Sequence, residues 1–210
     1  MSDPAQLYDA ILTGNAKQAE EVTNAALAAG VNPTELLGNY MIPAMDEVGK
    51  RFECNEYFVP ELLIAARAMK TALQILTPKL AEAGTEAAGR VVIGTVQGDL
   101  HDIGKNLVAS MLEGGGFEVV DLGVDVPASR FVEAAQEKNG TIVALSALLT
   151  TTMTQMKAVI EALEAAGLRG ATKVMVGGAP ITQQYADEIG ADGYSDNASA
   201  AVALARNLVK

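Results

Sequence analysis

The chain has 210 residues, half of them hydrophobic, and a formal net charge of -11. This composition predicts a globular protein of one or two domains and excludes a disordered chain. The acidic balance excludes nucleic acid and an anionic membrane surface as expected partners, because either would repel the protein. The sequence has neither a signal-peptide pattern nor an apolar run of the roughly 20 residues that a membrane span needs, so we expect a cytoplasmic protein.

Residues 4–80 carry apolar side chains at helical spacing. Signals for helix starts predict four helices, the first of them short. These signals are Asn15, the pair Asn32 and Pro33, and Pro60. Pro43 lies inside the third helix, where it should either kink the helix or be accommodated. We therefore predict a four-helix bundle, which forms a helical domain over residues 1–83.

Residues 84–89 are small, polar and without periodicity, which predicts a linker. Beyond the linker, short apolar runs alternate with amphipathic segments of helical length. The runs cover residues 91–96, 118–122, 141–146 and 173–177, with a weak fifth run at 193–194. Strands that are apolar on both faces and joined by helices predict a parallel sheet covered on both sides. Residues 90–210 are therefore predicted to form a flavodoxin-like, doubly wound α/β domain with five parallel strands.

The first predicted strand is followed by the segment QGDLHDIGKN, at the position where a doubly wound sheet presents its ligand loop. This segment contains His101, the only histidine of the chain. A neutral imidazole can bind a metal through one ring nitrogen while the other donates a hydrogen bond, usually to a carboxylate. Asp99 is placed to be that carboxylate. From the D-x-H-x-x-G spacing alone, a histidine that caps a helix or is exposed on a loop stays an open alternative.

Other chemistries fit the same loop less well. The loop lacks the glycine patterns of dinucleotide and P-loop sites. A hydrolytic zinc site needs three protein ligands, and beside His101 and the single thiol of Cys54 only carboxylates could complete it. A lone cysteine also excludes a disulfide within the chain. No G-x-S-x-G segment marks a serine nucleophile.

Three motifs follow one another in the C-terminal half. They are D-x-H-x-x-G at residues 99–104, S-x-L at residues 146–148, and the pair Gly177 and Gly178. Their order and spacing resemble the cobalamin-binding signature. The helical half contains GNAKQAEEVTNAALAAGVNPTELL, IPAMDEVGKRF and EYFVPELLIAARAMKTAL. It is similar to the cap domain of methionine synthase and of the small corrinoid methyl-carrier proteins of methanol, methylamine, glycine betaine and methoxy-aromatic methyltransferase systems. The resemblance covers essentially the whole chain.

The resemblance implies that the chain binds cobalamin, or a related corrinoid, in the base-off/His-on mode, with His101 as the lower ligand of cobalt. It further implies a relay of Asp99, His101 and Thr152 that couples proton uptake to cobalt ligation. Thr152 stands where methionine synthase has a serine, so the hydroxyl is kept. The residues implied to contact the cofactor in the sheet domain are Gly98, Asp99, Leu100, His101, Asp102, Ile103, Gly104, Ser146, Leu148, Thr150, Gly177 and Gly178.

Several of these residues have a physical reason in the resemblance. Gly104, Gly177 and Gly178 would leave room where the nucleotide tail of the cofactor passes close to the backbone. Ser146 would hydrogen-bond the buried heterocycle of that tail. Thr150 is a further candidate contact, although its run of three threonines could equally cap a helix.

The resemblance also places the helical domain over the upper face of the corrin, as a lid that shields the cobalt-bound methyl group. Phe58 is the candidate lid residue. An ordinary apolar staple before the helix at Pro60 is an equally good interpretation of Phe58.

The predicted function is that of a methyl carrier that is not catalytic by itself. A substrate-specific methyltransferase would load the methyl group onto cobalt, and an acceptor methyltransferase would pass it to a thiol or to tetrahydrofolate. A protein that reductively reactivates Co(II) is implied as a further partner. The alternatives are a cobalamin-dependent sensor, the cobalamin subunit of a radical isomerase, and a flavodoxin-like module that has lost its cofactor. A sensor would need a DNA-binding segment, and an isomerase subunit would usually lack the helical cap.

Overall fold

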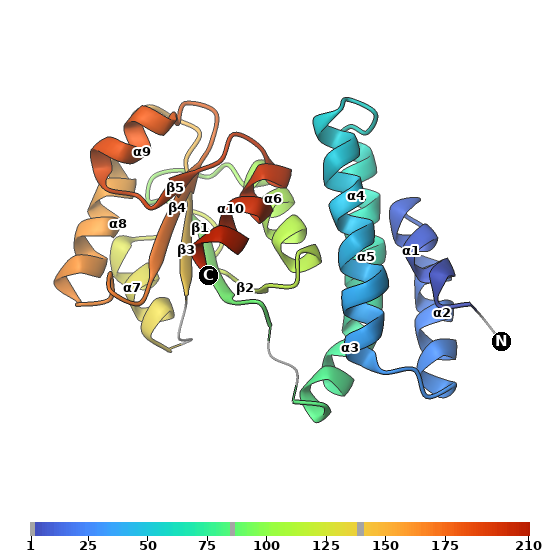
Figure 1. Cartoon of the computed structure of the whole chain (residues 1–210). Coiled ribbons are helices and arrows are strands. Elements are labelled where there is room, and N and C mark those ends of the chain that lie inside the picture. The colour runs from blue at the N-terminus through green and yellow to red at the C-terminus, as the bar shows by residue number, and fades with distance from the viewer. Residues whose placement is uncertain (1–2, 85–86, 138–140) are drawn as a thin grey trace. The chain divides into compact units, whose positions relative to one another are not determined.

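A computed structural model describes residues 3–84, 87–137 and 141–210 (Figure 1). The chain divides into two compact units, Met1–Ala87 with Glu113–Gly116, and Ala88–Leu112 with Phe117–Lys210. Residues 85 and 86 of the predicted linker lie outside the described residues.

The first unit is helical. Its elements are α1 (Ala5–Leu12), α2 (Ala16–Ala28), α3 (Pro33–Leu36), the π-helical segment η1 (Leu37–Met41), α4 (Ile42–Glu53) and α5 (Val59–Glu82). Because α3, η1 and α4 follow one another without a break, they form the single third helix that the sequence predicted. The core of the unit is apolar and includes the buried side chains of Leu7, Ile11, Leu36, Met41, Val48, Leu62, Met69 and Leu76. In the described part of the chain, no helix is long and apolar enough to cross a membrane.

Two asparagines begin helices as the sequence predicted. The side chain of Asn15 accepts a hydrogen bond from the backbone N–H of Gln18 at 3.1 Å. Asn32 accepts one from the backbone N–H of Thr34 at 2.8 Å. These bonds satisfy N–H groups that have no partner inside the helix, which is why asparagine stabilises a helix start.

Pro43 lies in the first turn of α4, directly after η1. A proline lacks an N–H, and its ring clashes with the carbonyl four residues earlier in a regular α-helix. In a π-helical turn the backbone bonds run to the fifth residue instead of the fourth, so the turn is wider. The helix therefore continues through Pro43, which is the accommodation that the sequence left open.

The second unit contains the sheet. Its strands are β1 (Arg90–Thr95), β2 (Glu118–Asp121), β3 (Ile142–Ser146), β4 (Lys173–Gly177) and β5 (Gly193–Tyr194). All pairs are parallel, and the order across the sheet is β2-β1-β3-β4-β5. This is the flavodoxin-like order, so the predicted fold class is confirmed.

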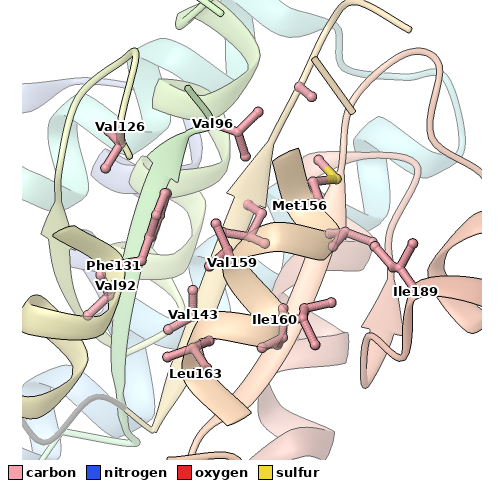
Figure 2. Packing of buried hydrophobic residues seen from close by; sticks show 14 of the residues in the cluster. Val92, Val96, Val126, Phe131, Val143, Met156, Val159, Ile160, Leu163 and Ile189 are labelled. Carbon is pink, nitrogen blue, oxygen red and sulfur yellow. The ribbon is translucent and has the colours of Figure 1, made fainter. Parts of the chain in front are cut away.

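Helices cover both faces of this sheet (Figure 1). They are α6 (Ile103–Gly114), α7 (Ala128–Glu137), α8 (Thr154–Ala165), α9 (Gln183–Ile189) and α10 (Ala198–Leu208). Helices α6 and α10 lie on one face, and α7 and α8 lie on the other. Figure 2 shows Phe131 of α7 and Val159 and Leu163 of α8 packed against Val92 and Val143 of the central strands. This buried layer gives the sheet a rigid frame, and the loops at its carboxyl edge start from that frame.

Candidate functional site

The carboxyl ends of three parallel strands bring the three sequence motifs together. Thr95 at the end of β1 pairs with Ser146 at the end of β3, and Ser146 pairs with Gly177 at the end of β4. The loops that leave these strands therefore start side by side. Ligands of open α/β sheets bind at this edge.

Asp99 and His101 form the central pair of the site. Nδ1 of His101 lies 2.7 Å from Oδ1 of Asp99, and the backbone N–H of His101 donates to the same oxygen over 3.1 Å. Because a carboxylate only accepts hydrogen bonds, Nδ1 carries the proton in this contact. Nε2 of the neutral ring then keeps its lone pair and is available to a metal. The side chain of His101 is 52% exposed, so a ligand can reach it.

The other carboxylate oxygen of Asp99 is bound by the loop between β3 and α8. Oδ2 accepts hydrogen bonds from the N–H of Leu148 at 2.8 Å, the N–H of Leu149 at 3.3 Å and the hydroxyl of Thr152 at 2.7 Å. Burial by itself raises the pKa of Asp99, which is fully buried. The hydrogen bonds from Leu148, Thr152 and His101 outweigh burial and hold the pKa of Asp99 well below its ordinary value. Asp99 is therefore ionised and can fix the tautomer of His101.

Large apolar side chains lie next to this pair without being covered. Leu100 is 70% exposed, and Ile103, the first residue of α6, is 81% exposed. Leu148 and Leu149 are exposed as well. Covering a side chain of this size stabilises a protein by about 1.5–3 kcal/mol, so their exposure together indicates a surface that fits a large apolar ligand.

The glycines of the three motifs differ in their surroundings. A Cβ atom added to Gly104 would meet nothing within 4 Å, so this position leaves space for a ligand. Gly178 has a φ of 133°, and an added Cβ would lie 1.9 Å from the carbonyl oxygen of Ala147. An added Cβ on Gly177 would lie 3.2 Å from the carbonyl oxygen of Ser195. The packing of the chain against itself therefore already requires glycine at position 178, apart from any space for the cofactor tail.

Ser146 is half-buried at the end of β3. Within residues 3–84, 87–137 and 141–210, no group hydrogen-bonds its hydroxyl. A half-buried hydroxyl without a protein partner fits the predicted contact with a ligand heterocycle.

The remaining predicted residues occupy different places. Asp102 is exposed, and its Oδ2 accepts a hydrogen bond from the side chain of Asn106 at 3.0 Å. Thr150 is exposed in the turn before α8. The alternative that its threonine run caps a helix is wrong, because the N-cap of α8 is Met153, which makes no side-chain cap. Phe58 belongs to the helical unit and is 60% exposed at the N-cap of α5, so its lid and staple roles both stay predictions.

Two polar contacts near the loop that carries His101 were not predicted from the sequence. Nζ of the buried Lys105 lies 2.5 Å from Oδ2 of Asp121, at the end of β2. Oδ1 of Asp125 accepts a hydrogen bond from the N–H of Gly98 at 2.7 Å. Both aspartates lie at or just beyond the carboxyl end of the second strand, where the loops of a doubly wound sheet hold binding residues. That position was the signal that could have identified them.

Among the residues that the structure describes, no group of three or more His, Cys, Asp and Glu side chains could hold a metal ion. The hydrolytic zinc site thus stays disfavoured. A single available imidazole beside an uncovered apolar surface fits a different group, a cofactor whose own macrocycle supplies the other ligands of its metal.

Two family models, both described as B12 binding domain, match residues 89–203 and residues 5–77. The chain belongs to the corrinoid-protein family. Its cofactor is cobalamin or a related corrinoid, with cobalt as the metal, as the sequence predicted. The donor set described above fits that cofactor, because His101 offers one exposed imidazole nitrogen and the surrounding loops offer an apolar surface.

Known relatives of this corrinoid protein match over almost its whole length. The trimethylamine corrinoid protein of Methanosarcina barkeri is 48% identical over 95% of this chain and 93% of the relative. Dimethylamine corrinoid protein 2 of Methanosarcina mazei is 48% identical over 85% of this chain and 84% of the relative. The crystal structure of the methanol:cobalamin methyltransferase complex of M. barkeri matches at 30% identity with a TM-score of 0.86, over 97% of this chain and 78% of that chain. The resemblance to the corrinoid methyl carriers is therefore confirmed.

Proposed function

We propose that this corrinoid protein carries methyl groups in a methylamine methyltransferase system and binds its cofactor in the base-off/His-on mode. The observation that carries the proposal is the contact between His101 and Asp99, 2.7 Å from Nδ1 to Oδ1. A buried, ionised carboxylate on one ring nitrogen fixes the tautomer and makes the other nitrogen a better metal ligand. His101 is exposed, so Nε2 is the protein atom proposed to bind cobalt.

When bound, the corrinoid supplies a cobalt atom that accepts and releases a methyl group. The residues of the chain are proposed to hold the corrinoid and to shield it from water. Asp99 holds a proton on Nδ1 of His101, and the proposed relay would couple proton uptake by the chain to cobalt ligation. Thr152 donates to Asp99 at 2.7 Å and completes the proposed relay. Leu100 and Ile103, both exposed, are proposed to exclude water from the covered face of the cofactor.

The methyl donor is inferred from the relatives. The proteins named for trimethylamine and dimethylamine are 48% identical to this chain, whereas the chain of the methanol complex is 30% identical. We therefore propose a methylated amine as the donor class. The proposed partners are a substrate-specific methyltransferase, an acceptor methyltransferase that uses a thiol or tetrahydrofolate, and a reductive activation protein for Co(II).

Residues 1–83, 84–89 and 90–210 are proposed as helical cap, linker and cofactor domain. Phe58, exposed at the start of α5, is proposed as the lid residue. The expected location is the cytoplasm.

Electron paramagnetic resonance tests the ligation directly. The full chain is labelled with nitrogen-15, loaded with unlabelled cobalamin and reduced to Co(II). Ligation by His101 splits the cobalt lines into doublets, because the axial nitrogen then comes from the protein. Ligation by the cofactor's own base gives triplets. We expect doublets for the wild type and their loss in His101→Ala, and triplets in the wild type would reject the His-on mode.

The methyl-carrier role is tested with the same loaded protein. For this test the loaded protein is reduced further, with a chemical reductant, to Co(I), the state that supplies the electron pair of the new cobalt–carbon bond. Purified methyltransferases for trimethylamine, dimethylamine and methanol are each mixed with this protein and the matching substrate, and the methylated cofactor is followed by its absorption spectrum. We expect methylation with an amine substrate. Methylation with methanol alone would reject the proposed donor class, and methylation with none of the three would reject this carrier role.

A further inference from the structure

Asp125 is a charged residue next to the site to which the proposed function gives no role. It lies in the loop between β2 and α7 and has a φ of 54°. Among the described residues, the only other non-glycine residue with positive φ is Asn55. A left-handed backbone costs such a residue roughly 1–2 kcal/mol, so it persists where surrounding contacts impose it.

Asp125 exchanges two hydrogen bonds with the loop that carries the cobalt ligand. Its Oδ1 accepts from the N–H of Gly98 at 2.7 Å, and its own N–H donates to the carbonyl oxygen of Asp99 at 2.9 Å. Gly98 also has a positive φ, 82°. A parallel bridge between Val96 and Val126 joins the same two loops. Two hydrogen bonds and the bridge thus hold these two loops together.

Asp99 is consequently held from both sides. Its backbone carbonyl is bound by Asp125, from the loop after β2, and its carboxylate is bound by Leu148 and Thr152, from the loop after β3. In the sheet, β2 and β3 are the two neighbours of β1. The loop after β1, which carries His101, is therefore hydrogen-bonded to the loops that follow both neighbouring strands.

We infer that Asp125 is a positioning residue for cobalt ligation, because its paired hydrogen bonds set the backbone of Asp99 and thereby the place of the His101 ring. This inference rests on the proposed His-on function. Metal sites need their ligands within about 0.5 Å and 10–20° of the productive geometry. Mutation of a residue that orients a metal ligand typically lowers metal affinity by about 10–100-fold. Asp125 contacts the backbone of Asp99 and not the His101 ring itself, so it acts less directly. We expect an effect at the lower end of that range.

Two substitutions separate the carboxylate from the backbone. Asp125→Gly removes the acceptor while glycine adopts the left-handed backbone without strain, so the fold is kept. Asp125→Asn keeps an acceptor oxygen and tolerates the same φ. The matched control is Asp192→Ala. Asp192 also binds a backbone N–H, that of Val174 at 2.6 Å. It directly precedes β5, and so lies at the amino ends of β4 and β5, away from the proposed site.

Two quantities are measured for each variant. The first is the ratio of Co(II) that shows the nitrogen-15 doublet to Co(II) that does not, in loaded full-length protein. The second is the midpoint of urea unfolding. We expect the ratio to fall about tenfold in Asp125→Gly. In Asp125→Asn it should stay within about threefold of the wild type. Asp192→Ala should lower the urea midpoint and leave the ratio unchanged.

The outcomes distinguish the two claims. A wild-type ratio in Asp125→Gly, or an equal fall in Asp192→Ala, overturns the positioning role and leaves the His-on mode standing. If the wild type itself shows no doublet, the His-on mode fails and this inference fails with it. If Asp125→Gly retains no corrinoid, Asp125→Asn decides: a wild-type ratio supports the positioning role, and loss of the doublet there rejects it.

Discussion

The hydroxyl of Thr152 lies 2.7 Å from Oδ2 of Asp99, although 53 positions separate the two residues in the chain. The same hydroxyl lies 3.0 Å from the carbonyl oxygen of Leu149. Its single proton is better donated to the charged carboxylate, because hydrogen bonds to charged groups are the stronger ones. This bond connects the loop after β3 to the loop that carries His101.

Thr152→Val removes this hydroxyl and keeps the shape of the side chain. We expect the free energy of unfolding of the corrinoid-free protein to fall by about 1.5–3 kcal/mol, the contribution of a hydrogen bond to a charged group. Thr152→Ser keeps the hydroxyl and should cost about 0.8 kcal/mol, for one lost methyl group. Urea denaturation measures both values. Equal losses would show that the methyl group, and not the hydrogen bond, matters at this position.

Asp99→Asn is expected to weaken ligation by His101. Both carboxylate oxygens of Asp99 receive hydrogen bonds, so an amide NH₂ on either side would face another donor. The ratio of His-on to His-off Co(II) should fall about 10–100-fold, as for other residues that orient a metal ligand. Asp187→Asn is the control, since Asp187 is exposed on α9 and binds the side chain of Gln183. An unchanged ratio in Asp99→Asn would show that ligation does not depend on the carboxylate.

Gly104→Ala tests whether the cofactor passes close to the start of α6. An added Cβ meets nothing within 4 Å, and alanine favours a helix over glycine by about 0.8–1 kcal/mol. The corrinoid-free protein should therefore be at least as stable as the wild type in urea. Corrinoid affinity should fall about tenfold or more in a titration followed by absorption, which corresponds to about 1.4 kcal/mol. Unchanged affinity would show that the glycine leaves room for no part of the cofactor.

Gly178→Ala should destabilise the chain even without the cofactor. The added Cβ would lie 1.9 Å from the carbonyl oxygen of Ala147, and a φ of 133° is strained for alanine. We expect a loss of about 1–3 kcal/mol in the free energy of unfolding, as for overpacked sites. Gly170→Ala is the matched control, because an added Cβ there meets nothing within 4 Å. It should change the free energy of unfolding by less than about 0.5 kcal/mol. Equal stability of the two variants would contradict the close approach of the two loops.

Most of the fold followed from local signals. The apolar runs lie within a residue of the observed strands, and Asn15 and Asn32 begin helices as expected. The pair of Asp99 and His101 was also predictable, since two positions separate them and the carboxylate reaches the ring without help from the rest of the fold. Such features depend on neighbours in the chain, where the spacing of side chains is set by the backbone itself.

By itself, therefore, the sequence determined the alternation of strands and helices, the ligand loop and the family. Only the tertiary structure decided which groups surround Asp99. Three sets of contacts join segments that are far apart in the chain. Leu148 and Thr152, after β3, donate to Asp99, after β1. Asp125, after β2, bonds the loop after β1, and Lys105 of α6 contacts Asp121 at the end of β2. Which loops meet depends on strand order and register, and these are set by packing of the whole core rather than by residues nearby in the chain.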